Sequence, residues 1–167
     1  QHIMPVYHHP EETFERGEGV RLITSEGKSY LDFVAGIAVS SLGHSHPDMV
    51  AALQDQASKL WHTSNMFRVP AGEDLARKIC ERVGFANRVF FTNSGTEAIE
   101  CALKTARKFH WVNGDPDRYE IVTLSGAFHG RSLGAINAGG NPKYLEGFGP
   151  ALPGFKQVDF DDHEALD

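Results

Sequence analysis

The chain has 167 residues, 41% of them hydrophobic and 10% aromatic, which is enough apolar material for the core of one globular domain and argues against disorder. Its 16 lysines and arginines are scattered among 22 aspartates and glutamates, and the resulting net charge of -6 disfavours a nucleic-acid or anionic-membrane partner. No apolar run approaches the roughly 18 residues of a membrane span, and the first residues lack a signal-peptide pattern, so we expect a cytoplasmic protein without a membrane partner.

The first part of the chain predicts a β-hairpin followed by a helix. Two β-prone runs, 20–24 and 29–33, flank a short turn that contains a glycine. Between Pro47 and Leu60 the apolar residues recur at helical spacing, and a proline suits the first turn of a helix. We therefore expect residues 1–64 to form an α+β segment.

Strands alternate with helices in the rest of the chain. This alternation is typical of a parallel sheet and predicts the first βαβ units of a larger α/β domain over residues 65–167. The last six residues have the pattern of a helix just begun, and a sheet that stops after two or three strands keeps an open edge. We therefore expect an incomplete, N-terminal part of a longer chain. The expected helices are 71–83 and 96–113, and the expected strands are 88–92, 120–124 and 155–158.

The two cysteines are Cys80 and Cys101. Both lie in expected helices among apolar neighbours, and no CxxC spacing is present. We expect two buried, reduced thiols.

A hydroxyl-rich turn precedes the second of these helices. Ser94, Gly95 and Thr96 stand at the helix N-terminus, where free backbone N–H groups and the helix dipole favour a phosphate and where a glycine permits close approach. Asn, Ser and Thr are also the residues that cap any helix, so the turn alone leaves both interpretations open. Neither GxGxxG after a strand nor GxxxxGK[ST] occurs, which argues against the common nucleotide-binding loops.

The stretch 125–131 follows the strand 120–124 and should lie at the carboxyl edge of the sheet, where open α/β sheets bind ligands. Phe128 can cover a flat heteroaromatic ring, and Arg131 can hold a carboxylate through two hydrogen bonds. Taken singly, such a phenylalanine is more often a core residue and such an arginine more often a solvated one.

Together these stretches resemble the class III pyridoxal-phosphate (PLP) aminotransferases, which have the fold type I α/β architecture. The resemblance covers nearly the whole chain, and chance agreement at so many ordered positions is remote. The matching segments are 16–19 (RGEG), 31–33 (LDF), 43–47 (GHSHP), 91–98 (FTNSGTEA), 104–107 (KTAR) and 128–131 (FHGR).

The resemblance implies a cofactor site for PLP. In the family, the turn that matches Ser94, Gly95 and Thr96 grips the cofactor phosphate. The aromatic residue that matches Phe128 stacks on the pyridine ring, and we place His129 in the same site.

The resemblance also implies a substrate site and a reaction. Arg131 matches the arginine that binds the α-carboxylate of the amino donor. Ile37 lies in a segment similar to that of members acting on N2-acetylornithine, whereas ornithine members carry a tyrosine there and 4-aminobutyrate members share an apolar residue. Ser40 departs from the asparagine common in the acetylornithine members. The implied reaction moves the distal amino group of N2-acetylornithine to 2-oxoglutarate, in arginine biosynthesis, and the implied assembly is a homodimer.

Several alternatives stay open. Succinylornithine, N-succinyl-diaminopimelate, ornithine and 4-aminobutyrate are other possible donors. None of the chain's seven lysines matches the Schiff-base lysine, whose position lies in sequence beyond Asp167, so we expect no catalytic residue here and no transamination by this chain alone. A non-catalytic module that binds PLP or phosphate is therefore a second possibility.

Two further features have competing interpretations. His44 and His46 have the HxH spacing of metal hydrolases, but no other ligand motif accompanies them, so we expect no metal site. Trp61, Met66 and Phe67 suit either a dimer interface or a core, and we expect core.

Overall fold

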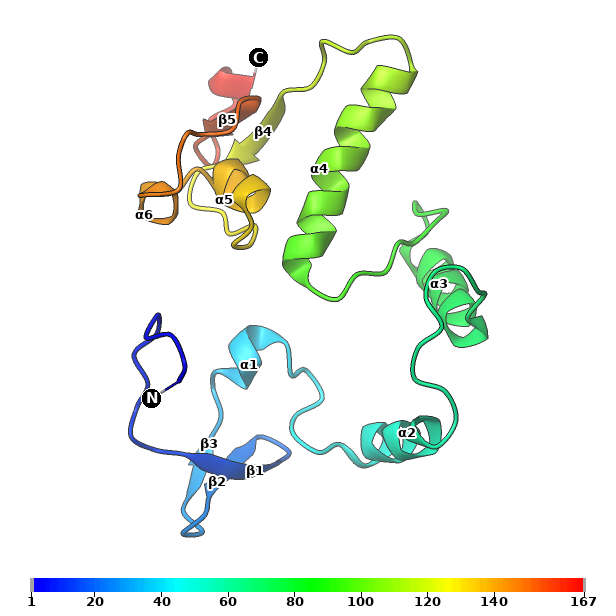
Figure 1. Cartoon of the computed structure of the whole chain (residues 1–167), viewed down its shortest axis with the longest axis vertical. Coiled ribbons are helices and arrows are strands. Elements are labelled where there is room, and N and C mark those ends of the chain that lie inside the picture. Colours follow the sequence, from blue (N-terminus) through cyan, green and yellow to red (C-terminus); the bar gives the residue numbers. More distant parts are fainter. Residues whose placement is uncertain (1, 167) are drawn as a thin grey trace. The chain divides into compact units, whose positions relative to one another are not determined.

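The computed structural model describes residues 2–166 (Figure 1). The backbone divides into two compact units, the first ending at Glu73 and the second beginning at Asp74. Within the described residues, no helix is both long enough and apolar enough to cross a membrane.

The first unit contains a three-stranded antiparallel sheet in the order β1-β2-β3. The predicted hairpin is confirmed, because β2 pairs with β3 and places Arg21 opposite Leu31. The strand β1 was not expected, since its sequence FERGE has no apolar alternation; it is held by pairing with β2 across a turn at Gly19, where φ is +54°. The strands are β1 (Phe14–Glu18), β2 (Arg21–Thr24) and β3 (Ser29–Leu31).

Two helical segments follow the sheet in this unit. The short α1 (Ala35–Ala38) is irregular, and α2 (Pro47–Ala57) is the amphipathic helix expected from the sequence, with Pro47 in its first turn. An isolated antiparallel bridge between Gly19 and His44 ties the segment before α2 back to the β1–β2 turn.

The second unit contains a parallel strand pair with a helical crossover. β4 and β5 pair in parallel with Ile121 opposite Phe155, and α5 lies against both strands (Figure 1). The third expected strand, over 155–158, is thus confirmed. The helices and strands that lie in or extend into this unit are α3 (Pro70–Val83), α4 (Gly95–Val112), β4 (Ile121–Leu124), α5 (Leu133–Gly139), α6 (Pro142–Leu145), β5 (Phe155–Val158) and the 3-10 turn η1 (Glu164–Leu166).

The core of the second unit is α5 and the strand face beneath it. Ala135, Ile136 and Ala138 of α5 are buried together with Val158 of β5. Polar side chains link the helix to the strands, since the Thr123 hydroxyl donates to the Ala138 carbonyl at 2.5 Å and the Gln157 side chain donates to the same carbonyl at 3.2 Å. The C-terminal end of α5 is therefore fixed to the sheet.

Three sequence expectations are wrong in detail. The run 88–92 is not a strand, because no described strand offers hydrogen bonds to it, and Phe90 is 72% exposed. The last turn is the 3-10 turn η1 rather than the start of an α-helix. Cys80 and Cys101 are free, as expected, but half-buried rather than buried, since the apolar side of each helix is only partly covered.

Many large apolar side chains of the described residues are exposed. Trp61 and Met66 are 85% and 87% exposed, and Phe67 is 68% exposed, so these three residues are not in a core within residues 2–166. The expectation that they are core residues is therefore wrong for the described chain, in which nothing packs over them.

Candidate functional site

The N-terminus of α4 is capped by its own turn. Ser94 has extended backbone angles, and its Oγ accepts the Glu97 N–H at 3.2 Å. In return, the Glu97 carboxylate accepts the Asn93 N–H at 3.0 Å and the Ser94 hydroxyl at 3.1 Å. This reciprocal arrangement is a variant of the capping box in which Glu97 accepts the Asn93 N–H instead of the Ser94 N–H, so the capping interpretation of Ser94 applies to the structure.

Capping leaves other groups of the same turn free. The first intrahelical hydrogen bond runs from the Ala98 N–H to the Ser94 carbonyl at 3.1 Å, and Glu97 N–H is used by the cap. The N–H groups of Gly95 and Thr96 therefore have no acceptor within residues 2–166. A Cβ added at Gly95 would meet no heavy atom within 4 Å, so the side of the turn at this residue is open. An anion fits this position, where the helix dipole favours negative charge.

A close contact joins this turn to the loop after β4. Gly130 has φ of +121°, and a Cβ placed on it would lie 2.2 Å from the Thr96 hydroxyl oxygen. The absence of a side chain at Gly130 thus allows the loop to rest directly against Thr96. The two sequence stretches singled out for phosphate and for ring or carboxylate binding are brought together by this contact.

The aromatic and the arginine of this loop lie next to each other and to a third residue. The Arg131 guanidinium carbon is 5.7 Å from the centre of the Phe128 ring and 4.2 Å from that of Tyr144, in α6. The Phe128 and Tyr144 rings are 6.2 Å apart and nearly perpendicular, at 85°. Phe128 is 64% exposed, so the core interpretation of this residue is wrong for the described chain, and one face of the ring can receive a ligand.

His129 lies between these two residues in sequence and is half-buried. Its Nε2 atom is enclosed and has no hydrogen-bond partner within residues 2–166. An enclosed imidazole nitrogen without a partner is costly, and a bound group would satisfy it.

Ile37 belongs to the first unit and lies in an unusual backbone turn. Four successive residues, 35–38, have φ between +46° and +67°, which makes α1 a left-handed turn. Three of them are not glycine, and each such residue is strained by about 1–2 kcal/mol. Strain of this kind collects at functional sites, and the Ile37 side chain is 85% exposed.

The Asp32 carboxylate holds the start of this turn. One of its oxygens accepts the Val34 and Ala35 N–H groups, both at 2.9 Å, and the other lies 2.7 Å from His44 Nε2. These hydrogen bonds hold the pKa of Asp32 below its ordinary value, and the bond from the Ala35 N–H has the largest effect. His44 is packed against Gly17, where an added Cβ would lie 2.5 Å from the ring. His44 therefore has a structural partner in the first unit.

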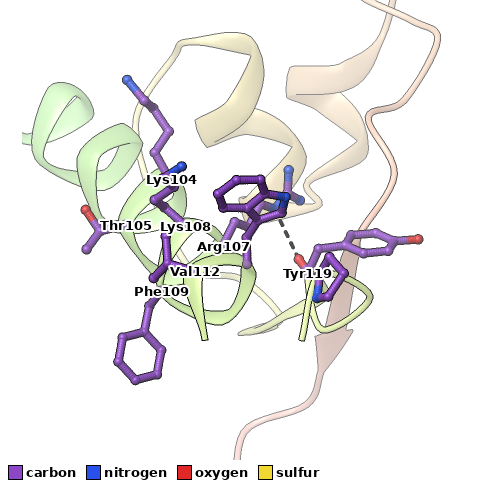
Figure 2. Close-up of a pocket in the computed structure, with 9 residues that line it drawn as sticks. Lys104, Thr105, Arg107, Lys108, Phe109, Val112 and Tyr119 are labelled. Atoms are coloured by element: carbon purple, nitrogen blue, oxygen red, sulfur yellow. Dashed lines mark hydrogen bonds between the residues drawn. The ribbon is translucent and has the colours of Figure 1, made fainter. Parts of the chain in front are cut away.

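A separate groove lies on the C-terminal half of α4 (Figure 2). Phe109, Trp111 and Tyr119 give it an apolar lining, and the Arg107 side chain donates to the Tyr119 carbonyl at 3.1 Å beside it. The groove contains none of the residues expected to bind cofactor or substrate. Its α4 residues, 104–112, begin nine residues after Gly95, which places the groove roughly 13 to 25 Å along the helix axis from the capped turn.

Two residues, one in each unit, were not singled out from the sequence. Tyr144 lies in a short segment without helical periodicity. Only its proximity to Arg131 in the folded chain indicates that it has a role. Asp32 belongs to the matched segment 31–33, but its local hydrogen bonds to the next residues are the signal that would have found it, because aspartate commonly accepts N–H groups two and three residues ahead.

Comparison with known proteins gives a consistent result. The model of the family "Aminotransferase class-III" matches residues 3–167. The chain is 58% identical over 165 residues to acetylornithine aminotransferase 2 of Caulobacter vibrioides, covering 99% of this chain and 40% of the relative. It is 60% identical over 153 residues to the acetylornithine aminotransferase of Brucella melitensis biotype 1, covering 92% of this chain and 38% of that relative. The chain thus spans about 40% of the length of the curated relatives it matches.

Solved structures of similar proteins share the backbone. Ornithine aminotransferase from Toxoplasma gondii has a TM-score of 0.92 at 33% identity, over 99% of this chain and 39% of that one. N-acetylornithine aminotransferase from Stenotrophomonas maltophilia K279a has a TM-score of 0.76 at 39% identity, over 96% and 38%. The predicted partial α/β fold is confirmed by these likenesses.

Proposed function

The chain belongs to the class III aminotransferase family, and we propose that the complete protein transfers the distal amino group of N2-acetylornithine to 2-oxoglutarate with PLP as cofactor. The observation that carries the proposal is the contact of Gly130 with Thr96. It brings the free N–H groups of the α4 N-terminus next to the loop that carries an exposed aromatic ring and an arginine.

The residues of this site fit PLP. The N–H groups of Gly95 and Thr96 would hold its phosphate, together with the Thr96 hydroxyl, and Phe128 would cover its ring. His129 Nε2 offers a further polar contact to the bound group. When bound, PLP supplies an electron sink for the charge that develops at the carbon bearing the migrating amino group.

The chain's own residues would orient the donor. Arg131 holds the α-carboxylate, and a carboxylate fixed at one end of the donor presents the distal amine for reaction. Ile37, on its strained turn, gives an apolar surface suited to an acylated α-amino group rather than a charged one. Glu97 keeps Ser94 in the cap, so the turn is preorganised before any ligand arrives.

The choice of N2-acetylornithine rests on the names of the curated relatives and on Ile37. Ser40 departs from the asparagine common in the acetylornithine members, and a hydrophobic pocket separates acyl variants by only about 1–3 kcal/mol per methylene. Use of succinylornithine alongside acetylornithine is compatible with this proposal.

We test the proposal by mixing the complete protein with PLP and recording its visible absorbance. N2-acetylornithine should bleach the band of the protein-bound cofactor, and 2-oxoglutarate should restore it. 4-Aminobutyrate and ornithine serve as control donors. Bleaching by one of these alone would keep the family but exclude our substrate, and absence of any band would overturn the proposed function.

We also propose that the complete protein is a homodimer in the cytoplasm. The exposed side chains of Trp61, Met66 and Phe67 support an interface, because exposed apolar patches are typical of association surfaces. The test is the molar mass in solution, and a monomer at micromolar concentration would exclude the assembly.

A further inference from the structure

Arg131 is held by rings rather than by an acid. Its guanidinium carbon is 4.2 Å from the centre of the Tyr144 ring, within the range in which a cation is attracted to an aromatic face. The Phe128 ring is the second aromatic neighbour, at 5.7 Å. Within residues 2–166 no carboxylate is ion-paired with Arg131, whereas Arg68 pairs with Glu73 at 2.6 Å.

This difference matters for binding a carboxylate. An acidic partner would occupy the guanidinium N–H donors and would neutralise the charge. A ring face attracts the cation through its quadrupole and leaves the in-plane N–H groups free. The N–H donors of the Arg131 guanidinium therefore remain available to an incoming carboxylate, while the two rings restrict the position of the guanidinium.

The placement of Tyr144 is fixed by the backbone around it. Gly140, with φ of +62°, ends α5 directly against Gln157, where an added Cβ would lie 2.5 Å from that side chain. Asn141 then caps α6 by accepting the Lys143 N–H at 3.0 Å, and Pro142 stands in the first turn. Because α5 is buried against the sheet, Tyr144 has a fixed position relative to the loop that carries Arg131.

We propose that Tyr144 is a positioning residue, which holds the Arg131 guanidinium ready for the substrate carboxylate through the face of its ring. This inference rests on the proposed function, because it assumes that Arg131 binds the donor. It assigns the effect to the ring and not to the hydroxyl, since no hydrogen bond of that hydroxyl is found within the described residues.

The test compares Tyr144→Leu with Tyr144→Phe in the complete protein. Tyr144→Leu should raise KM for N2-acetylornithine about three- to tenfold with little change in kcat, because the lost cation–ring attraction is of that size. Tyr144→Phe keeps the ring and should restore the wild-type KM. N-acetylputrescine, the same donor without its carboxylate, should react equally well with all three proteins.

A second readout does not depend on turnover. Isothermal calorimetry with glutarate, an unreactive dicarboxylate, should show weaker binding to Tyr144→Leu than to the wild type and to Tyr144→Phe. Equal glutarate binding by all three proteins, or an equal loss with N-acetylputrescine, would overturn this inference. Loss of the PLP absorbance band in the wild type would instead overturn the proposed function, and the two failures are thereby distinguished.

Discussion

Gly95 is the residue at which capping and phosphate binding have different consequences. A methyl group there meets no protein atom within 4 Å, and the residue has helical backbone angles, so Gly95→Ala should keep or slightly raise the melting temperature of the ligand-free protein. The same methyl group would occupy the space for the phosphate, and the Kd for PLP should rise by about tenfold or more. Absorbance titration with PLP measures this effect.

Gly72→Ala is the matched control, because Gly72 is also helical and an added Cβ would meet only the Val69 side chain, at 3.9 Å. This variant should bind PLP like the wild type. Unchanged PLP affinity in Gly95→Ala would leave the turn with a capping role alone.

Asp32 makes the left-handed turn sensitive to pH. Hydrogen bonds from Ala35 and His44 hold the pKa of Asp32 below 3.8, so this carboxylate stabilises the folded state fully above the unfolded pKa, and the contribution is lost as pH falls through the folded pKa. Protection of residues 33–40 against hydrogen exchange, corrected for intrinsic rates, should be steady from about pH 7 to 5 and should fall below about pH 4.

Asp32→Asn removes the charge while keeping the shape of the side chain. The variant should lose protection over residues 33–40 at neutral pH and show little further loss in acid. Asp55→Asn, which removes one member of an exposed pair with Lys59, should behave like the wild type. Equal pH profiles for Asp32→Asn and the wild type would refute the role of the charge.

At the scale of elements, Arg107 connects α4 to the beginnings of two strands. Its side chain donates to the carbonyls of Tyr119, Pro153 and Gly154 at 3.1 to 3.4 Å, and the guanidinium lies 5.0 Å from the centre of the Phe155 ring. A lysine has no planar fork to reach several carbonyls at once. Arg107→Lys should therefore destabilise the protein by about 1–3 kcal/mol, measured as a lower urea midpoint.

Arg118→Lys is the control for this prediction, since no side-chain interaction of Arg118 is found within residues 2–166. Its urea midpoint should match that of the wild type. A comparable fall in urea midpoint in both variants would show that any arginine-to-lysine change has this effect, and that the link between α4 and the strands is not its cause.

At the scale of the whole molecule, the sequence predicted the elements that depend on neighbouring residues better than the pairings that depend on distant ones. Apolar periodicity and the positions of glycine and proline are properties of neighbouring residues. They are sufficient to predict the hairpin, α2, α4 and the strands near 121–124 and 155–158. The run 88–92 has the composition of a strand, yet pairing decides whether one forms. Tyr144 beside Arg131 depends on the crossover between β4 and β5, which no local pattern contains.

The crossover also sets the order in which the molecule acquires its parts. The β2–β3 hairpin closes a turn of a few residues, whereas β4 can pair with β5 only when residues 125–154 have closed into a loop. Closing the longer loop costs roughly 2 kcal/mol more in chain entropy, so the hairpin forms earlier in folding. Phe128, Arg131 and Tyr144 all lie within this loop. The proposed ligand site should therefore be among the last features to form, and we expect a partly folded chain to bind neither cofactor nor substrate there.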